Sequence, residues 1–180
     1  MRRIYLYSQV IVMFLVIIFV VGWSYVNGLN PFRIIPIRAC ENGYSNFKST
    51  VIVSENDLED FLKKTCMRFG WNNRKDFEET LYNAEVDFHK EALVLLRHSD
   101  CSGSITVRIE TPVLKSKTLY CRISRNVPLI ATCDLVSYCL AIAVDKDAVH
   151  KVEFNNNQNK KVQLTISEEK TVEQTGAPDK

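Results

Sequence analysis

Residues 92–96, Ala92-Leu93-Val94-Leu95-Leu96, form an unbroken apolar run near the middle of the chain. A run of this length predicts a strand covered on both faces, because a half-buried strand would alternate apolar and polar residues. A second run, Cys139-Leu140-Ala141-Ile142-Ala143-Val144, has the same character. These two segments predict strands buried inside the domain.

Weaker strand patterns surround the two buried runs. In residues 105–110 and 119–124, apolar and polar side chains alternate, which is typical of strands with one face on a core. Apolar residues at 152–154 and 162–166 predict a closing hairpin around the polar loop 155–161. Several strands at short spacing favour a mostly antiparallel sheet.

Helices are expected only before the first buried run. The β-branched segment 49–53 predicts a short strand, and Ser54 has the character of an N-cap for a helix over residues 55–66. A second helix is predicted over residues 74–84. The expected fold class is therefore α+β: an N-terminal transmembrane helix, then a small domain with a mostly antiparallel β-sheet and two short helices.

The segment Ile4–Val26 contains no charged residue. As a helix of 23 residues it would be about 34 Å long, enough to cross a hydrocarbon core of about 30 Å. Aromatic residues flank it, as in the interfacial belts of membrane spans. We expect an uncleaved signal anchor that contacts membrane lipid; the alternative is a signal peptide cleaved near Gly22-Trp23-Ser24.

The sequence divides into four parts. Residues 1–26 are the expected signal anchor, and residues 27–48 are the expected juxtamembrane connector, in which Pro31 and Pro36 oppose helix continuation. Residues 49–167 are the expected extracytoplasmic domain, and residues 168–180 form a polar tail.

Charge excludes one class of partner. Arg2 and Arg3 are the only two of the 23 basic residues before Val26, so the rest of the chain carries 21 basic residues against 21 acidic ones. Nucleic-acid binding depends on neutralising many phosphates. A neutral domain therefore predicts no nucleic-acid partner.

All six cysteines follow the apolar segment. An even number on one side of a span fits an oxidising compartment, so we expect the domain to be periplasmic or at the cell surface; six reduced thiols in a cytoplasmic domain are the alternative. Simple sheet topology places the loops of Cys101 and Cys133 at the same end, which makes Cys101–Cys133 the first candidate disulfide. The other disulfide candidates are Cys121, Cys139, Cys40 and Cys66.

The order of several short segments resembles a known family. Val86-Asp87-Phe88-His89-Lys90-Glu91 precedes the buried run, Ser102-Gly103-Ser104 forms a turn, and 140–144 is a late apolar strand. This order resembles PrcB-type C-terminal domains, found in accessory subunits of bacterial surface protease complexes, and related uncharacterised bacterial exported proteins. Over residues 50–154 the resemblance implies a β-rich domain that binds or steadies another protein and has no catalytic residues to transfer.

No motif predicts a metal, a cofactor or a catalytic site. The three histidines, His89, His98 and His150, lack the closely spaced partners of a zinc site. The function expected is therefore a membrane-anchored, non-enzymatic domain that binds another envelope protein. Two alternatives stay open: an anchored structural or stress protein, and an envelope enzyme whose acids and bases would be Asp87, Asp100, Asp134 and His98.

Overall fold

The computed structural model of the protein describes residues 31–66, 71–130, 132–155 and 161–166. Residues 32–180 form one unit that contains these elements, and the fold is α+β with mostly antiparallel strands, as the sequence indicates. The expected transmembrane helix lies outside the described residues. Within them, no helix combines the length and apolar character that crossing a bilayer requires.

The two buried apolar runs form the centre of the first sheet. β3 (Glu91–Asp100) and β7 (Val136–Asp145) pair antiparallel over ten residues, from Glu91 opposite Asp145 to Asp100 opposite Val136. Two short antiparallel strands complete the order β1-β7-β3-β2: β1 (Phe32–Ile35) and β2 (Thr50–Ile52). Both faces of β3 are buried, as its unbroken apolar run predicts.

The second sheet comes from the alternating segments. Its order is β4-β6-β8-β9, and β5 pairs with the free half of the β6 edge. Its strands are β4 (Thr106–Ile109), β5 (Val113–Lys115), β6 (Thr118–Asn126), β8 (Lys151–Asn155) and β9 (Lys161–Thr165). The predicted hairpin of β8 and β9 is confirmed, whereas β5 and the parallel pairing of β6 with β8 have no signal in the sequence.

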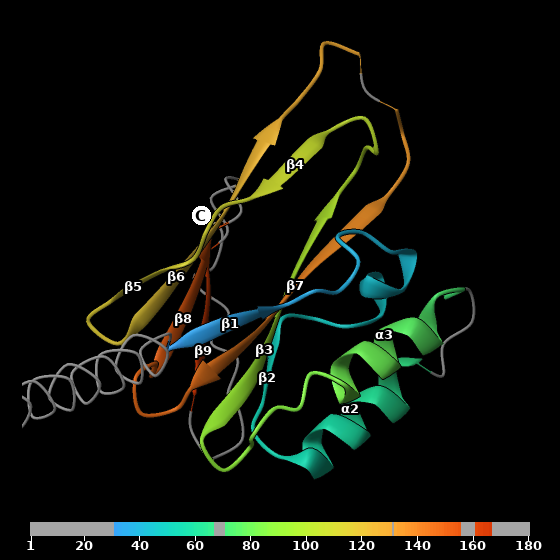
Figure 1. The fold of residues 1–180 in the computed structure, drawn as a ribbon. Coiled ribbons are helices and arrows are strands. Elements are labelled where there is room, and N and C mark those ends of the chain that lie inside the picture. Colours follow the sequence, from blue (N-terminus) through green and yellow to red (C-terminus); the bar gives the residue numbers. More distant parts are fainter. Residues whose placement is uncertain (1–30, 67–70, 131, 156–160, 167–180) are drawn as a thin grey trace, which may run out of the picture. The chain divides into compact units, whose positions relative to one another are not determined.

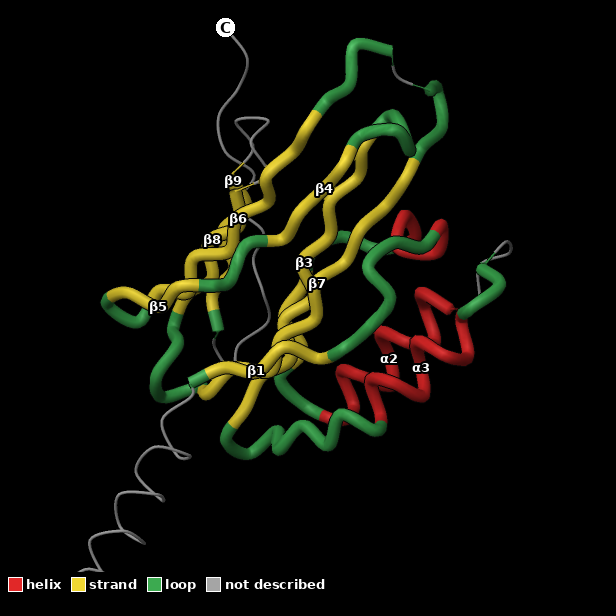
Figure 2. The backbone as a smooth tube through the Cα atoms, turned by 45° about the horizontal axis from the view of Figure 1, so that its top comes forward, coloured by secondary structure: helices red, strands yellow, loops and turns green. Residues whose placement is uncertain are grey.

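The second sheet covers one face of the first sheet, and the two helices cover the opposite face (Figure 2). α2 (Glu55–Cys66) has the predicted bounds, and Ser54 caps it: its Oγ accepts a hydrogen bond from Asp57 N at 3.1 Å and donates one to Asp57 Oδ2 at 2.8 Å. α3 (Arg74–Tyr82) ends two residues earlier than predicted.

The domain therefore has three layers and two cores, which alternate residue by residue along β3. Leu93 and Leu95 pack toward the helices, together with Leu58, Leu62 and Leu81. Ala92, Val94 and Leu96 pack toward the second sheet, against residues that include Leu119, Cys121, Val152 and Phe154. Because successive strand residues point to opposite faces, one strand serves both cores.

The folded domain begins earlier than the sequence indicates. Within the expected connector 27–48, β1 pairs with β7, and a 3-10 helix, η1 (Asn42–Asn46), contributes the buried residues Gly43 and Tyr44. The prolines do oppose a long helix here, but an edge strand tolerates a neighbouring proline equally well. The run Phe32-Arg33-Ile34-Ile35 is too short to be recognised by its period.

An aromatic cluster holds η1 against the helices. Tyr44 makes edge-to-face contacts with Trp71 at 5.7 Å and Phe77 at 5.5 Å between ring centroids. Gly43 lies directly beneath Trp71: a Cβ at this position would lie 1.8 Å from the indole Cδ2 atom. Only a glycine leaves room for the ring here.

We therefore predict that Gly43→Ala destabilises the domain by about 2 kcal/mol, because the added methyl group forces Trp71 out of its place. Thermal unfolding of the full chain in detergent micelles, followed by circular dichroism, should show a melting temperature lower by roughly 5 °C. Asn42→Ala, at the preceding position, is the matched control and should change it by less than about 2 °C. Equal melting temperatures for the wild type and Gly43→Ala would contradict the packing described.

Candidate interaction surface

The connection between β6 and β7, described for residues 127–130 and 132–135, projects from one end of the two sheets (Figure 1). It carries four large apolar side chains that face solvent: Leu129 is 107% exposed, Ile130 88%, Leu135 65% and Val127 56%. Single exposed apolar residues are ordinary on a protein surface, but a group of them in one loop makes that loop a candidate interaction site. We call residues 127–130 and 132–135 the apolar loop.

The apolar loop is fastened to the neighbouring β3–β4 connection by polar contacts. Thr132 Oγ1 lies 3.1 Å from Ser102 Oγ and 2.9 Å from Ser104 Oγ. Gly103 N donates a hydrogen bond to Asp134 Oδ1 at 3.0 Å, and a Cβ on Gly103 would lie 2.3 Å from Asp134 Oδ2. Hydrogen bonds from the Thr132 hydroxyl and the Gly103 amide lower the pKa of Asp134.

A buried charged cluster lies at the base of the apolar loop. Asp100 ends β3, and its carboxylate accepts hydrogen bonds from Arg125 Nε at 2.6 Å and from Arg125 Nη2. His98 Nε2 lies 3.1 Å from Asp100 Oδ2, and the side chains of both residues are at most 1% exposed. Arg125 precedes the last residue of β6, so Asp100 joins the end of β3 to the strand that leads into the loop.

The charges within this cluster determine the ionisation of Asp100. Burial alone would raise the pKa of its carboxyl group, but hydrogen bonds from Arg125 and His98, together with their charges, lower the pKa below its ordinary value. On its other side, His98 stacks on Tyr138 at 6.2 Å between ring centroids. Its Nδ1 atom is buried and has no hydrogen-bond partner within the described part of the chain.

The alternative enzyme site is only partly assembled. His98 and Asp100 are together, but the guanidinium of Arg125 occupies both carboxylate oxygens. Asp134 lies in the apolar loop, where it binds Gly103, and Asp87 lies beyond the opposite end of β3, where its Oδ1 accepts a hydrogen bond from His89 N. The four residues therefore do not converge on one cavity.

The cysteines fall into two groups. Cys121 and Cys139 are buried, and burial raises the pKa of the Cys121 thiol to about 12 and that of Cys139 further still. Cys40, Cys101 and Cys133 are exposed, and all three lie at the apolar-loop end of the first sheet. The backbone of Cys40 forms an isolated antiparallel β-bridge with that of Tyr138, Cys101 follows β3, and Cys133 precedes β7.

The loops of Cys101 and Cys133 thus lie together as predicted, and the polar contacts above join them. The five described cysteines are free thiols in this structure, and the Cys101–Cys133 disulfide stays a prediction. The side chain of Cys66 lies outside the described residues.

The remaining histidines are surface residues. His89 is exposed in the connection before β3, and the exposed His150 has its Nε2 atom 3.3 Å from Lys117 Nζ. Among the described residues, no three His, Cys, Asp or Glu side chains are grouped as metal ligands.

Comparison with protein-family models, with curated proteins and with solved structures found no match to this chain. The resemblance to PrcB-type domains therefore stays a prediction, and the function has to be inferred from the chain's own residues and geometry.

The sequence contains a signal for the apolar loop that the strand and helix patterns leave out. Val127-Pro128-Leu129-Ile130-Ala131 is an apolar run, but Pro128 removes a backbone donor and opposes a strand. An apolar run that can join no sheet is a candidate for exposure. The Asp100–Arg125 contact has no such signal, because it depends on the pairing of distant strands.

We predict that Asp100→Asn lowers the free energy of unfolding at pH 7 by about 2 kcal/mol, because the Arg125 guanidinium loses its charged partner and can only partly reach water. The pKa of Asp100 is lower in the folded state than its ordinary value of 3.8, so the carboxylate stabilises the fold above pH 3.8. This stabilisation is lost as the pH falls through the lower, folded-state pKa.

Urea unfolding of the wild type and Asp100→Asn between pH 7 and pH 3 measures this difference. The gap between the two proteins should be full at pH 7 and should shrink below about pH 3.8. Asp60→Asn, which removes an exposed partner of Lys64, is the control and should change stability by less than about 0.5 kcal/mol. A gap independent of pH would show that the carboxylate charge is not what stabilises the cluster.

Proposed function

We propose that this protein is a membrane-anchored extracytoplasmic domain that binds another envelope or surface protein through the apolar loop. The observation that carries the proposal is the exposure of Leu129 and Ile130 on a loop whose base is held by buried charged contacts. Apolar side chains presented in advance on a fixed support lose little conformational entropy when a partner covers them.

A protein partner fits the loop better than the protein's own bilayer. The chain enters the domain at Phe32, which pairs with Val144 near the far end of β7, whereas the apolar loop joins the opposite end at Val136. Eight strand residues separate these positions, or about 26 Å. The apolar loop therefore lies at the end of the sheet opposite Phe32, where the chain enters the domain.

The proposed localisation, anchored in a membrane with the domain outside the cytoplasm, rests on the sequence. Residues 4–26 have the length and apolar character of a bilayer span, and the exposed cysteines are suited to an oxidising compartment. The resemblance to PrcB-type domains implies the same role, an accessory domain that binds or steadies a protein.

A photoreactive amino acid at position 130 of the full-length chain, activated in native membranes, tests the contact. We predict one discrete crosslinked product with a different protein, and none when the photoreactive residue is placed at Tyr82, an exposed position at the end of α3.

The captured protein, once purified, should bind the wild type at least about tenfold more tightly than Leu129→Ser/Ile130→Ser, because each buried aliphatic side chain contributes about 1.5–3 kcal/mol.

Tyr82→Ser is the matched variant, since it removes a similar exposed apolar surface elsewhere and should leave the affinity unchanged. Crosslinks from position 130 only to lipid, or only to a second copy of this chain, would contradict the proposal. Equal affinity of the wild type and the loop variant would contradict it as well.

The proposed extracytoplasmic localisation predicts which cysteines react with reagents applied outside the cell membrane. After treatment with a reductant that cannot cross membranes, a membrane-impermeant maleimide should label Cys40, Cys101 and Cys133 on cells with a sealed cytoplasmic membrane. Cys121 and Cys139 should react only after unfolding, because both are buried. Labelling of the three exposed cysteines only after cell lysis would place the domain in the cytoplasm.

A further inference from the structure

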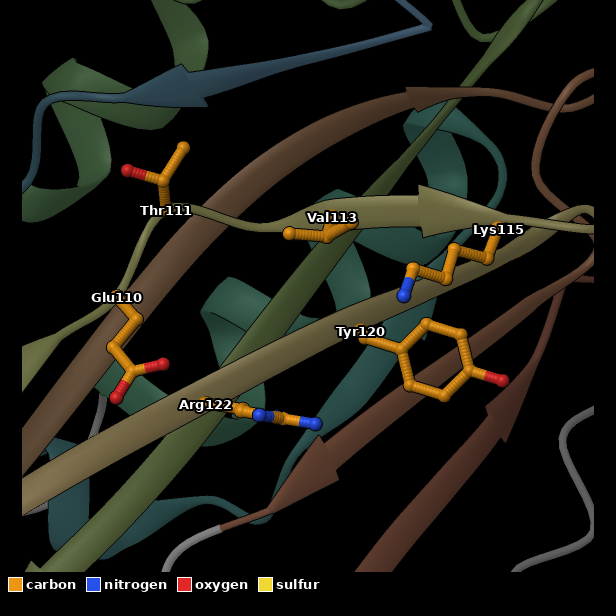
Figure 3. Close-up of a pocket in the computed structure, with 6 residues that line it drawn as sticks. All are labelled: Glu110, Thr111, Val113, Lys115, Tyr120 and Arg122. Atoms are coloured by element: carbon orange, nitrogen blue, oxygen red, sulfur yellow. The ribbon is translucent and has the colours of Figure 1, made fainter.

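A pocket of about 350 Å³ opens on the outer face of the second sheet, where β4 gives way to β5 along the same edge of β6 (Figure 3). This volume is within the range of small-molecule sites. Six residues line the pocket: Glu110, Thr111, Val113, Lys115, Tyr120 and Arg122.

The strand period places these side chains on one face. Cys121 is buried, so Tyr120 and Arg122, its neighbours along β6, point outward. Val113 pairs directly with Tyr120, and pairing residues in a sheet share a face. Glu110 N donates a hydrogen bond to Arg122 O at 3.0 Å, after which the chain leaves the β6 edge and opens the pocket.

The pocket holds two cations without anionic partners. Within the described ranges, the side chains of Lys115 and Arg122 make no ion pair or hydrogen bond, and the exposed Glu110 does not approach Arg122 closely enough to form one. Two other arginines of this domain do have carboxylate partners: Arg33 pairs with Glu91, and Arg125 pairs with Asp100. With one carboxylate and two cations, the pocket has a net charge of +1.

The arrangement of the lining groups defines the chemistry of a ligand. In Figure 3, Lys115 and Tyr120 lie at one side of the view and Glu110 and Thr111 at the other, with Arg122 extending along β6 between them. A guanidinium binds a carboxylate through two parallel hydrogen bonds, and an ammonium adds a point charge. The Tyr120 ring and the Val113 methyl groups offer apolar contact.

We propose that this pocket binds the carboxylate of a small organic monoanion. Arg122 and Lys115 hold the carboxylate, Tyr120 and Val113 contact an apolar or aromatic group beside it, and Glu110 with Thr111 accepts a hydrogen bond from an amide or hydroxyl of the same ligand. The net charge of +1 matches a monoanion and disfavours a phosphate dianion, which Glu110 would repel. Either a free organic acid or the C-terminal carboxylate of a peptide presents this chemistry.

This site is independent of the apolar loop and of its proposed partner, because the two surfaces share no residue. Failure of one proposal therefore leaves the other standing. The loop variant Leu129→Ser/Ile130→Ser should bind carboxylates as the wild type does.

Isothermal titration calorimetry of the full chain in detergent micelles tests the site with four probes. These are N-acetyl-phenylalanine, its uncharged primary amide, inorganic phosphate and the tripeptide Gly-Gly-Phe with a free C-terminus. We expect N-acetyl-phenylalanine to bind with a Kd of about 1 mM, as suits a ligand of this size, and the amide and phosphate to bind at least about tenfold more weakly. Tighter binding of the tripeptide would identify a peptide terminus as the natural source, and weaker binding a free acid.

Variants assign the binding to named residues. Arg122→Gln and Lys115→Gln should each weaken N-acetyl-phenylalanine binding about tenfold, because each removes a charge-assisted hydrogen bond. Arg108→Gln removes an exposed cation from β4 of the same sheet and should have no effect. Arg122→Lys keeps the charge without the planar guanidinium and should show an intermediate loss of affinity. This graded effect would distinguish a loss of binding chemistry from misfolding of the glutamine variant.

Four results would overturn the proposal, three of them comparisons of affinity. The three comparisons are equal binding of N-acetyl-phenylalanine and its amide, tighter binding of phosphate than of N-acetyl-phenylalanine, and unchanged affinity in Arg122→Gln. Absence of measurable binding at about tenfold above the expected Kd would do the same.

Discussion

The pairing of β3 with β7 is the constraint on which the rest of this domain depends. Ten consecutive residue pairs join the two strands, and both faces of the pair are buried, one under the helices and one under the second sheet. If a strand buried on both faces slipped by one residue, every side chain would move into the wrong core. A slip of two residues would break hydrogen bonds between the paired strands and move apolar side chains out of a core. The register of β3 and β7 therefore aligns the loops at their ends, and the apolar loop and the β3–β4 connection meet because Asp100 lies opposite Val136.

The same register explains how a buried charge supports an exposed apolar surface. Asp100 is the last residue of β3, and the arginine that it binds belongs to the second sheet, so the ion pair joins the two sheets at the end where the loop projects. A buried ion pair is often no more stabilising than an apolar pair of the same size, but it is more demanding in geometry. Here that geometry fixes the end of β6 against the end of β3, directly before the residues of the apolar loop.

Much of the fold could be predicted from the sequence, and the reasons differ between elements. The apolar runs 92–96 and 139–144 and the capped helix 55–66 have strong local signals, and the structure confirms all three. β1, β5 and η1 are three to five residues long, too short for a period to be recognised, and their conformation depends on the partners they pack against. The pocket at Arg122 and the Asp100–Arg125 cluster bring together residues from different strands, so only the pairing of those strands reveals them. The exposure of Leu129 could have been inferred from the proline beside it.

The parallel pairing of β6 with β8 has a consequence for how the chain acquires its structure. Between these two neighbours the chain passes through β7, which belongs to the other sheet, so Thr118 and its partner Lys151 meet only after that excursion. Contacts of this sequence separation close large loops, and closing large loops is slow. The helices α2 and α3 can form from local contacts, whereas the core between the two sheets must wait for β8 and β9. Until β8 and β9 are in place, the face of β3 that carries Ala92, Val94 and Leu96 is uncovered, and the unfinished chain exposes the apolar surface on which aggregation begins.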